Sequence, residues 1–182
     1  TVFFGTPEFA VPALRALAAS EFRPALVVSQ PSRPAKRGQR LTDPPVVEAA
    51  RELGMAYEQV EKVRDLAFLD RLAKLAPDIA VVVAFGQLFP RALLELPRLG
   101  CVNLHASLLP RWRGAAPIQA AIAAGDPVTG VTTMLMAEGL DSGPMLLRAE
   151  LAIGPRETAG ELGRRLAELG GPLLVESLRG LA

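Results

Sequence analysis

Hydrophobic residues gather in short runs along the chain, and the stretches between these runs carry apolar residues at helical spacing. The short runs predict strands at Thr1–Phe4, Ala25–Ser29, Ala56–Gln59, Ile79–Ala84, Cys101–His105, Val131–Met136 and Met145–Leu151. The intervening stretches predict helices at Glu8–Ala19, Pro44–Leu53, Asp65–Leu75, Pro117–Ala124 and Glu157–Leu178. This alternation predicts an α/β fold: one domain over residues 1–182, with an open, mostly parallel sheet and helices on both faces.

Three loops follow predicted strands, at Gly5–Pro7, Pro31–Pro45 and Ala106–Ala116. In open α/β sheets, ligands bind outside the carboxyl ends of the strands, so these loops are expected to surround any site. Thr6 is expected to cap the first helix and Pro7 to be its first residue. Proline and glycine in the second loop predict that it forms no regular element.

Composition narrows the classes of function. The single cysteine, Cys101, excludes an internal disulfide, and with one histidine, His105, the chain lacks a His/Cys zinc set, so no metal is expected. The net charge of +1 requires any nucleic acid to bind at a local patch. The longest apolar run, Ile79–Phe85, is far shorter than the ~18 residues of a membrane helix. Without a recognisable signal peptide, a cytoplasmic protein is expected.

Polar residues at the end of one predicted strand indicate a candidate catalytic site. Asn103 and His105 are two positions apart, so their side chains share a face. Asp141 lies in a glycine-flanked turn that could fold over this strand end. An amide, an imidazole and a carboxylate suit acyl transfer to an amine: the amide stabilises the oxyanion, the imidazole moves a proton and the carboxylate orients the imidazole. The alternative to a catalytic role is structural: His105 would only form local hydrogen bonds, and Asp141 would only stabilise its turn.

The sequence around these residues resembles the formyltransferase family that uses 10-formyltetrahydrofolate. The resemblance is carried by Asn103-Leu104-His105, by Ser107-Leu108-Leu109-Pro110 and by Leu140-Asp141-Ser142-Gly143. It covers essentially the whole chain and implies a Rossmann-like formyltransferase fold with Asn103, His105 and Asp141 as catalytic residues. It implies 10-formyltetrahydrofolate as the formyl donor, bound by Phe85, Gly86, Gln87, Leu88, Ser107, Leu108, Leu109, Pro110, Glu138, Gly139 and Leu140.

Two further segments, Phe4–Ala10 and Pro110–Gln119, resemble the family members that formylate methionyl-tRNA. The resemblance implies methionyl initiator tRNA as the acceptor, in translation initiation, and we expect a monomer. In those members a β-barrel domain that helps to hold tRNA follows, and we expect it to be absent here. Four cations and one anion give the loop Pro31–Pro45 a local charge of +3, which suits RNA phosphates. Arg111 and Trp112 are further candidates for that surface, and the alternative for Trp112 is a packing role. The candidates for tRNA contact are Arg37, Gly38, Gln39 and Arg40.

Other functions stay open at this point. Transfer to a nucleotide-linked aminosugar would keep the chemistry, but a small acceptor has little use for a basic loop. Glycinamide ribonucleotide formyltransferases share the Asn-x-His and Asp core, yet usually open with a glycine-rich phosphate loop that Gly5–Pro7 does not provide. A nucleotide- or RNA-binding module without catalysis is compatible with the fold, but it would leave Asn103, His105 and Asp141 without a shared purpose.

Overall fold

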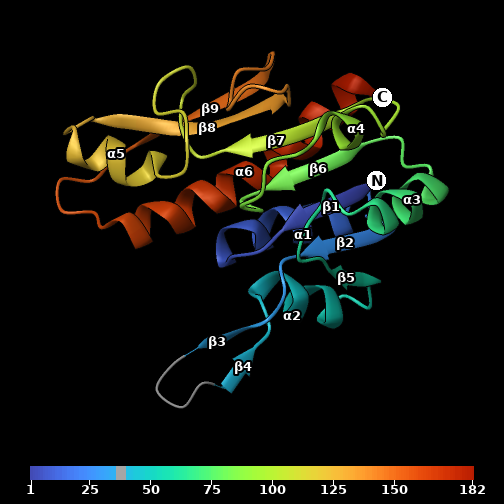
Figure 1. Cartoon of the computed structure of the whole chain (residues 1–182). Helices are drawn as coiled ribbons and strands as arrows, with labels where there is room; N and C mark the ends of the chain where they lie inside the picture. Colours follow the sequence, from blue (N-terminus) through green and yellow to red (C-terminus); the bar gives the residue numbers. More distant parts are fainter. Residues whose placement is uncertain (36–39) are drawn as a thin grey trace.

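A twisted open sheet forms the centre of the molecule (Figure 1). The computed structural model describes residues 1–35 and 40–182. Within these residues the sheet has seven strands, in the order β5 (Tyr57–Gln59), β2 (Leu26–Ser29), β1 (Val2–Gly5), β6 (Ala80–Val83), β7 (Cys101–His105), β8 (Val128–Leu135) and β9 (Met145–Ala152). The strands from β5 to β7 are parallel, whereas β8 and β9 are antiparallel. The parallel strands therefore end at one edge, on the left of Figure 1.

Helices cover both faces of this sheet, as the alternating pattern predicts. They are η1 (Glu8–Ala10), α1 (Val11–Ala18), α2 (Pro45–Glu52), α3 (Leu66–Leu75), α4 (Arg91–Leu94), α5 (Pro117–Ala123) and α6 (Ala159–Leu181). Asp65 begins α3 by accepting a hydrogen bond from the N–H of Ala67, and Thr158 and Glu161 form a capping box that begins α6. None of these helices, the 23-residue α6 included, combines the length and the apolar character that crossing a membrane requires.

The core is divided between the two faces because successive strand residues point in opposite directions. Phe3 and Val102 are buried with side chains of α1, α2 and α6. Phe4 and Val82 are buried on the opposite face with side chains of α3 and α4. The Phe4 ring makes edge-to-face contacts with three other phenylalanine rings. The sheet is thus a rigid support for the loops at its carboxyl edge.

Each of the seven strands predicted from the sequence is found, and β8 begins three residues earlier than expected, at Val128. Each of the five predicted helices is found as well, with the first divided into η1 and α1. The short helix α4 was not predicted, because four residues are too few to show helical periodicity. The fold class is therefore the expected one, an open and mostly parallel α/β sheet.

The expectation of no regular element between Pro31 and Pro45 is wrong. β3 (Arg33–Ala35) and β4 (Arg40–Thr42) pair as an antiparallel hairpin, which projects below the sheet in Figure 1. Both are edge strands of a two-stranded sheet, where proline is tolerated. The base of the hairpin is held where the Ser32 hydroxyl donates to Asp43 at 2.5 Å.

The predicted cap of the first helix is also wrong. The residue that precedes η1 is Pro7, without a side-chain cap, so neither Thr6 nor Pro7 takes its expected place. The hydroxyl of Thr6 instead donates to the Phe85 carbonyl at 3.3 Å. Thr6 therefore joins the loops that follow β1 and β6.

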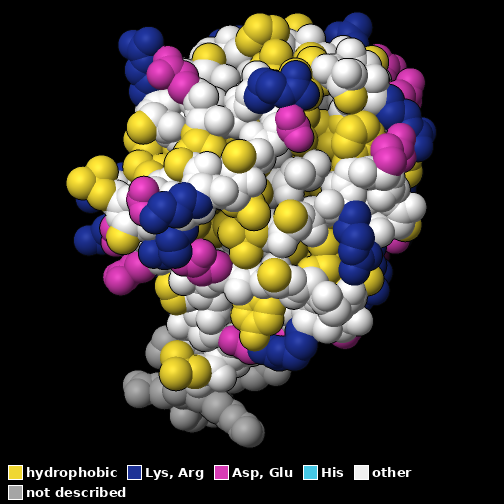
Figure 2. Space-filling view, turned by 90° about the vertical axis from the view of Figure 1, so that its right-hand side faces the viewer, with side chains coloured by type: hydrophobic (Ala, Val, Ile, Leu, Met, Phe, Trp, Pro, Cys, Tyr) yellow, Lys and Arg dark blue, Asp and Glu magenta, His cyan; other side chains and the backbone are white. Residues whose placement is uncertain are grey.

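The surface opposite the carboxyl edge carries charges of both signs. Figure 2 shows this side, on which Lys and Arg side chains lie beside Asp and Glu side chains and among apolar ones. Arg98 and Asp78, which precede β7 and β6, form one such exposed pair at 2.9 Å. This face therefore carries no extended patch of positive or negative charge alone.

Candidate active site

The strand β7 places two polar side chains on the face opposite the α1 and α6 core. Val102 and Leu104 point into that core, so Asn103 and His105 point the other way. Asn103 is half-buried, and its side chain forms no hydrogen bond with the described part of the chain. It is therefore available to a ligand at the carboxyl edge.

His105 and Asp141 meet at the end of this strand. The His105 Nδ1 atom lies 3.7 Å from Asp141 Oδ2, and the two side chains are 8% and 12% exposed. The other ring nitrogen, Nε2, donates a proton to the Trp112 carbonyl at 2.9 Å. Burial from water strengthens the effect of the carboxylate on the ring. Within the described residues, no group of three or more His, Cys, Asp or Glu side chains is arranged to hold a metal ion.

The turn between β8 and β9 brings Asp141 to this position. Asp141 has a left-handed φ of 47°, and its Oδ2 atom accepts a hydrogen bond from the Gly114 N–H at 2.8 Å. Gly143 lies so close to the Leu135 carbonyl oxygen that a Cβ atom there would collide with it. Asp141 is therefore held in a tight turn and by a hydrogen bond from the loop after β7.

The loop after β7 is held by Thr132 of β8, a residue that was not predicted from the sequence. Thr132 of β8 donates its hydroxyl proton to the Ser107 carbonyl at 2.7 Å and accepts the Leu109 N–H at 3.1 Å. The Ser107 side chain is fully buried and donates to the Arg111 carbonyl at 2.6 Å, so its hydroxyl supports the loop. In the sequence, Thr132 is one of two adjacent threonines in a predicted strand, and no local signal marks it as a support for the loop.

A second missed residue, Asp126, anchors the far part of the same loop. Its carboxylate accepts hydrogen bonds from Arg111 and from the Trp112 indole, and the Arg111 guanidinium stacks on that indole. Trp112 therefore packs locally, whereas Arg111 is 59% exposed. In the sequence, Gly125-Asp126 has the form of an ordinary turn after a helix.

The expected donor-binding segments border the same edge. Phe85 is buried in the core, and its carbonyl accepts hydrogen bonds from Thr6 and Gln30. Gly86 has a φ of 81°, and a Cβ atom there would approach the Gln30 amide. The Gln87 side chain is bonded to the segment after β5, whereas Leu88 is 80% exposed.

The other expected segments follow β7 and β8. Leu108 is half-buried, Leu109 is buried and Pro110 is exposed. Glu138, Gly139 and Leu140 are exposed, and Glu138 comes within 3.8 Å of Arg91 on α4. The structure therefore brings the segment after β8 next to the one after β6, with the Asn103, His105 and Asp141 group at the same edge.

Three of the four candidates for RNA contact, Arg37, Gly38 and Gln39, lie outside the described residues. The fourth, Arg40, is the first residue of β4, opposite Ala35. Arg33 on β3 donates to the Gln30 side chain at 2.7 Å. Since Gln30 also donates to the Phe85 carbonyl at 2.7 Å, one side chain joins the base of the hairpin to the loop after β6.

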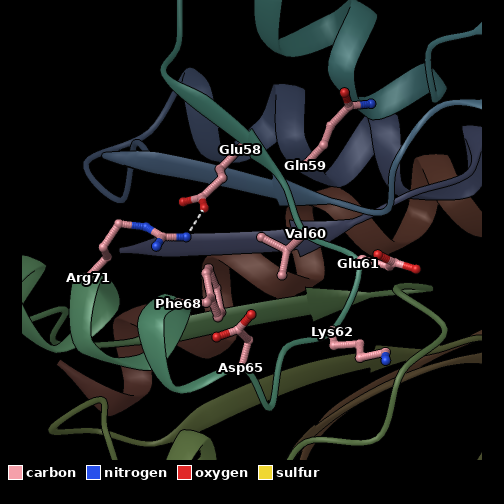
Figure 3. Close-up of a pocket in the computed structure, with 8 residues that line it drawn as sticks. All are labelled: Glu58, Gln59, Val60, Glu61, Lys62, Asp65, Phe68 and Arg71. Carbon is pink, nitrogen blue, oxygen red and sulfur yellow. Dashed lines mark hydrogen bonds and ion pairs between the residues drawn. The ribbon is translucent and has the colours of Figure 1, made fainter.

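A separate hollow of about 320 Å³ lies between β5 and α3 (Figure 3). Glu58 and Arg71 point toward each other across it and form an ion pair. Asp65, at its lower rim in the figure, is the residue that caps α3. The hollow includes none of the expected catalytic or donor-binding residues, and two of its charged residues, Glu58 and Arg71, are already paired.

The chain is similar to known proteins in sequence and in fold. The chain is 54% identical over 179 residues to the methionyl-tRNA formyltransferase of Aromatoleum aromaticum, and 56% identical over 177 residues to that of Halorhodospira halophila. These alignments cover 98% and 97% of this chain, which spans 57% of the length of each relative.

Solved structures share the fold at lower identity. Phosphoribosylglycinamide formyltransferase from Bacillus halodurans superposes with a TM-score of 0.80 at 23% identity, over 99% of this chain and 93% of its own. Glycinamide ribonucleotide transformylase 1 from Symbiobacterium toebii gives 0.81 at 22% identity, over 98% and 84%. The family model for formyl transferases matches residues 1–178. The chain therefore belongs to the formyl transferase family.

Proposed function

We propose that this chain transfers the formyl group of 10-formyltetrahydrofolate to the α-amine of methionine esterified to initiator tRNA. The observation that carries the proposal is the contact of His105 Nδ1 with Asp141 Oδ2, at 3.7 Å, at the carboxyl end of β7, the strand that carries Asn103 on the same face as His105. The identity of 54–56% with methionyl-tRNA formyltransferases supports the choice of acceptor. The cytoplasm and a monomeric state remain expectations.

The reaction begins when the substrate amine attacks the formyl carbon. A carbon–nitrogen bond forms, and the carbonyl electrons move to oxygen. In this proposal the Asn103 amide donates a hydrogen bond to that oxyanion, a contribution that typically accelerates such reactions by about 10²–10³-fold. Collapse of the intermediate breaks the bond from the carbon to the folate nitrogen. No enzyme nucleophile is required.

The proton has to move from the attacking amine to the leaving folate nitrogen. Nε2 of His105 is engaged with the Trp112 carbonyl at 2.9 Å, so Nδ1 is the nitrogen free to accept a proton. The nearby Asp141 carboxylate stabilises the imidazolium that forms. His105 then returns the proton to the folate nitrogen, which leaves neutral. Asp141 also has the capacity to hold an ordered water.

The donor would occupy the edge between the loops after β6 and β8. A flat pterin ring needs an apolar slot with main-chain groups along its edge. Leu88 and Leu140 are 80% and 62% exposed and supply apolar surface, and Gly86 permits a close approach of the backbone. We assign donor binding to Phe85, Gly86, Gln87, Leu88, Ser107, Leu108, Leu109, Pro110, Glu138, Gly139 and Leu140, with the Ser107 hydroxyl supporting the loop.

The acceptor would contact the hairpin β3–β4. This segment has a local excess of positive charge and extends from the sheet on the side of α2 (Figure 1). Phosphate contacts from such a segment give affinity that falls with salt. We assign tRNA contact to Arg37, Gly38, Gln39 and Arg40.

The test is formyl transfer from 10-formyltetrahydrofolate to three acceptors in parallel: methionyl initiator tRNA, glycinamide ribonucleotide and a nucleotide-linked aminosugar. It is run with this chain and with the chain extended to the length of its relatives. Transfer to the tRNA is the expected result. Transfer to a small acceptor alone would keep the chemistry and overturn the acceptor. No transfer by either form would overturn the proposal.

A further inference from the structure

The imidazole of His105 is held by the loop that follows β7. Its Nε2–H donates to the main-chain carbonyl of Trp112 at 2.9 Å. A carbonyl oxygen only accepts, so this bond keeps a proton on Nε2 and leaves Nδ1 facing Asp141. The position of one carbonyl therefore decides which nitrogen of His105 can receive a proton.

Trp112 has a backbone conformation that bulky residues rarely adopt. Its φ is 59°, in the left-handed region. Such a conformation persists only where surrounding contacts hold it. For Trp112 these contacts come from Asp126, whose Oδ2 accepts the indole N–H at 2.7 Å. Arg111 donates to both carboxylate oxygens, at 2.7 and 3.0 Å, and lies 4.4 Å from the centre of the indole ring.

Asp126 is itself fixed by the fold. It lies between α5 and β8, and its N–H donates to the Ala121 carbonyl at 3.1 Å. Its side chain is 16% exposed, although its partner Arg111 is 59% exposed. Hydrogen bonds from Arg111 and Trp112 lower the pKa of the Asp126 carboxyl below its usual value, so these contacts persist at neutral pH.

We propose that Asp126 is a positioning residue for His105. Through the indole of Trp112 it holds the carbonyl that keeps the imidazole proton on Nε2. Without the carboxylate, Trp112 is free to leave its left-handed conformation, and its carbonyl turns away from the ring. His105 then samples both tautomers and a wider range of orientations. The kinetic consequence rests on the proposed function, whereas the effect on the tautomer does not.

The test uses the chain's single histidine, whose imidazole gives one set of ¹⁵N signals. These signals, recorded with the ring neutral, report which nitrogen carries the proton. Asp126→Ala removes the carboxylate, and Trp112→Phe removes the indole N–H while keeping an aromatic ring. Asp126→Asn keeps an oxygen that can accept the indole N–H. Asp78→Ala is the matched control, because it breaks an exposed pair with Arg98 at the opposite edge of the sheet.

The wild type and Asp78→Ala are expected to carry the proton on Nε2. Asp126→Ala and Trp112→Phe are expected to give a mixture of tautomers and to lower kcat by about 10- to 100-fold, with KM for the donor within about twofold. Asp126→Asn should restore most of the Nε2–H form.

An unchanged tautomer in both Asp126→Ala and Trp112→Phe would overturn the proposal, even if kcat fell. If Asp126→Ala does not fold, Trp112→Phe decides. The NMR signals do not depend on turnover, so they test this positioning role even if no acceptor is formylated.

Discussion

The Oδ2 atom of Asp141 lies 3.7 Å from His105 Nδ1 and accepts the Gly114 N–H at 2.8 Å. A single carboxylate oxygen therefore connects the loop after β8 with the loop after β7 and faces the imidazole. The second ring nitrogen is bonded to Trp112 in the same loop. The orientation of His105 thus depends on contacts that come from two separate loops.

Replacing Asp141 by asparagine separates the charge of this residue from its structural contact. In Asp141→Asn the amide oxygen can still accept the Gly114 N–H, but the negative charge beside His105 is lost. We expect kcat to fall by about 10²–10⁴-fold. Thermal unfolding should change little. Steady-state kinetics with the Asp78→Asn control measure the effect, and a kcat equal to that of the wild type would remove Asp141 from the mechanism.

Two glycines of α6 should respond to alanine in opposite directions. A Cβ atom at Gly170 would lie 2.5 Å from Leu104 Cδ2, so Gly170→Ala is expected to destabilise the protein by about 1–3 kcal/mol. At Gly163 the nearest atom would lie at 3.5 Å, and Gly163→Ala should stabilise by up to about 1 kcal/mol. Denaturant unfolding compares the two. Equal effects would show that α6 does not pack closely on β7 at Gly170.

The thiol of Cys101 should be unreactive in the folded protein. Burial raises its pKa to about 12 from an ordinary value of 9.0. The thiolate fraction at mildly alkaline pH is then lower by about 10³-fold, and the thiolate is the reactive form. We expect an alkylating reagent to modify Cys101 only after unfolding. Rapid modification of the native protein, measured by mass spectrometry, would contradict the buried position of this side chain.

The same shift in pKa predicts how stability depends on pH. A raised folded-state pKa means that the folded protein holds the thiol proton more tightly than the unfolded chain does. This contribution is therefore fully present below about pH 9 and is lost as the pH rises toward about 12. Cys101→Ala should show a weaker decline in its unfolding midpoint over this range. Identical declines would show that other groups account for it.

Loss of positive charge on the hairpin should weaken acceptor binding and leave the chemistry intact. We expect Arg37→Ala and Arg40→Ala to raise KM for methionyl-tRNA, with the slope of log affinity against log salt reduced by about 1 for each lost phosphate contact. The exposed Arg98 provides the control variant Arg98→Ala. An equal rise in KM for all three variants would argue against an RNA-binding role for the hairpin.

Much of the fold was predictable because it depends on local patterns. The apolar run that forms β6 has the length and composition of a buried strand, and the spacing of Asn103 and His105 places them on one face in any strand. The pairing of Asp141 with His105 was conditional on the turn folding over the strand end, and the family resemblance added the expectation that both residues are catalytic.

Other features depend on contacts that no local pattern records. The hairpin β3–β4 lacks an apolar alternation, and it is held by Ser32 and Asp43, which are 11 residues apart. Asp126 gains its role from Arg111 and Trp112, which lie 15 and 14 residues before it in the sequence. Thr6 bonds to Phe85, 79 residues away, instead of capping the helix next to it. In each case tertiary contacts override the local expectation.

The central claim is that Asn103 and His105 perform formyl transfer. It is tested most directly by the rate of a single turnover from saturating 10-formyltetrahydrofolate to methionyl initiator tRNA. The wild type is expected to transfer the formyl group, and Asn103→Ala and His105→Ala are expected to be slower by about 10²-fold or more, with the fold intact. Transfer at the wild-type rate by either variant would contradict this account of the active site.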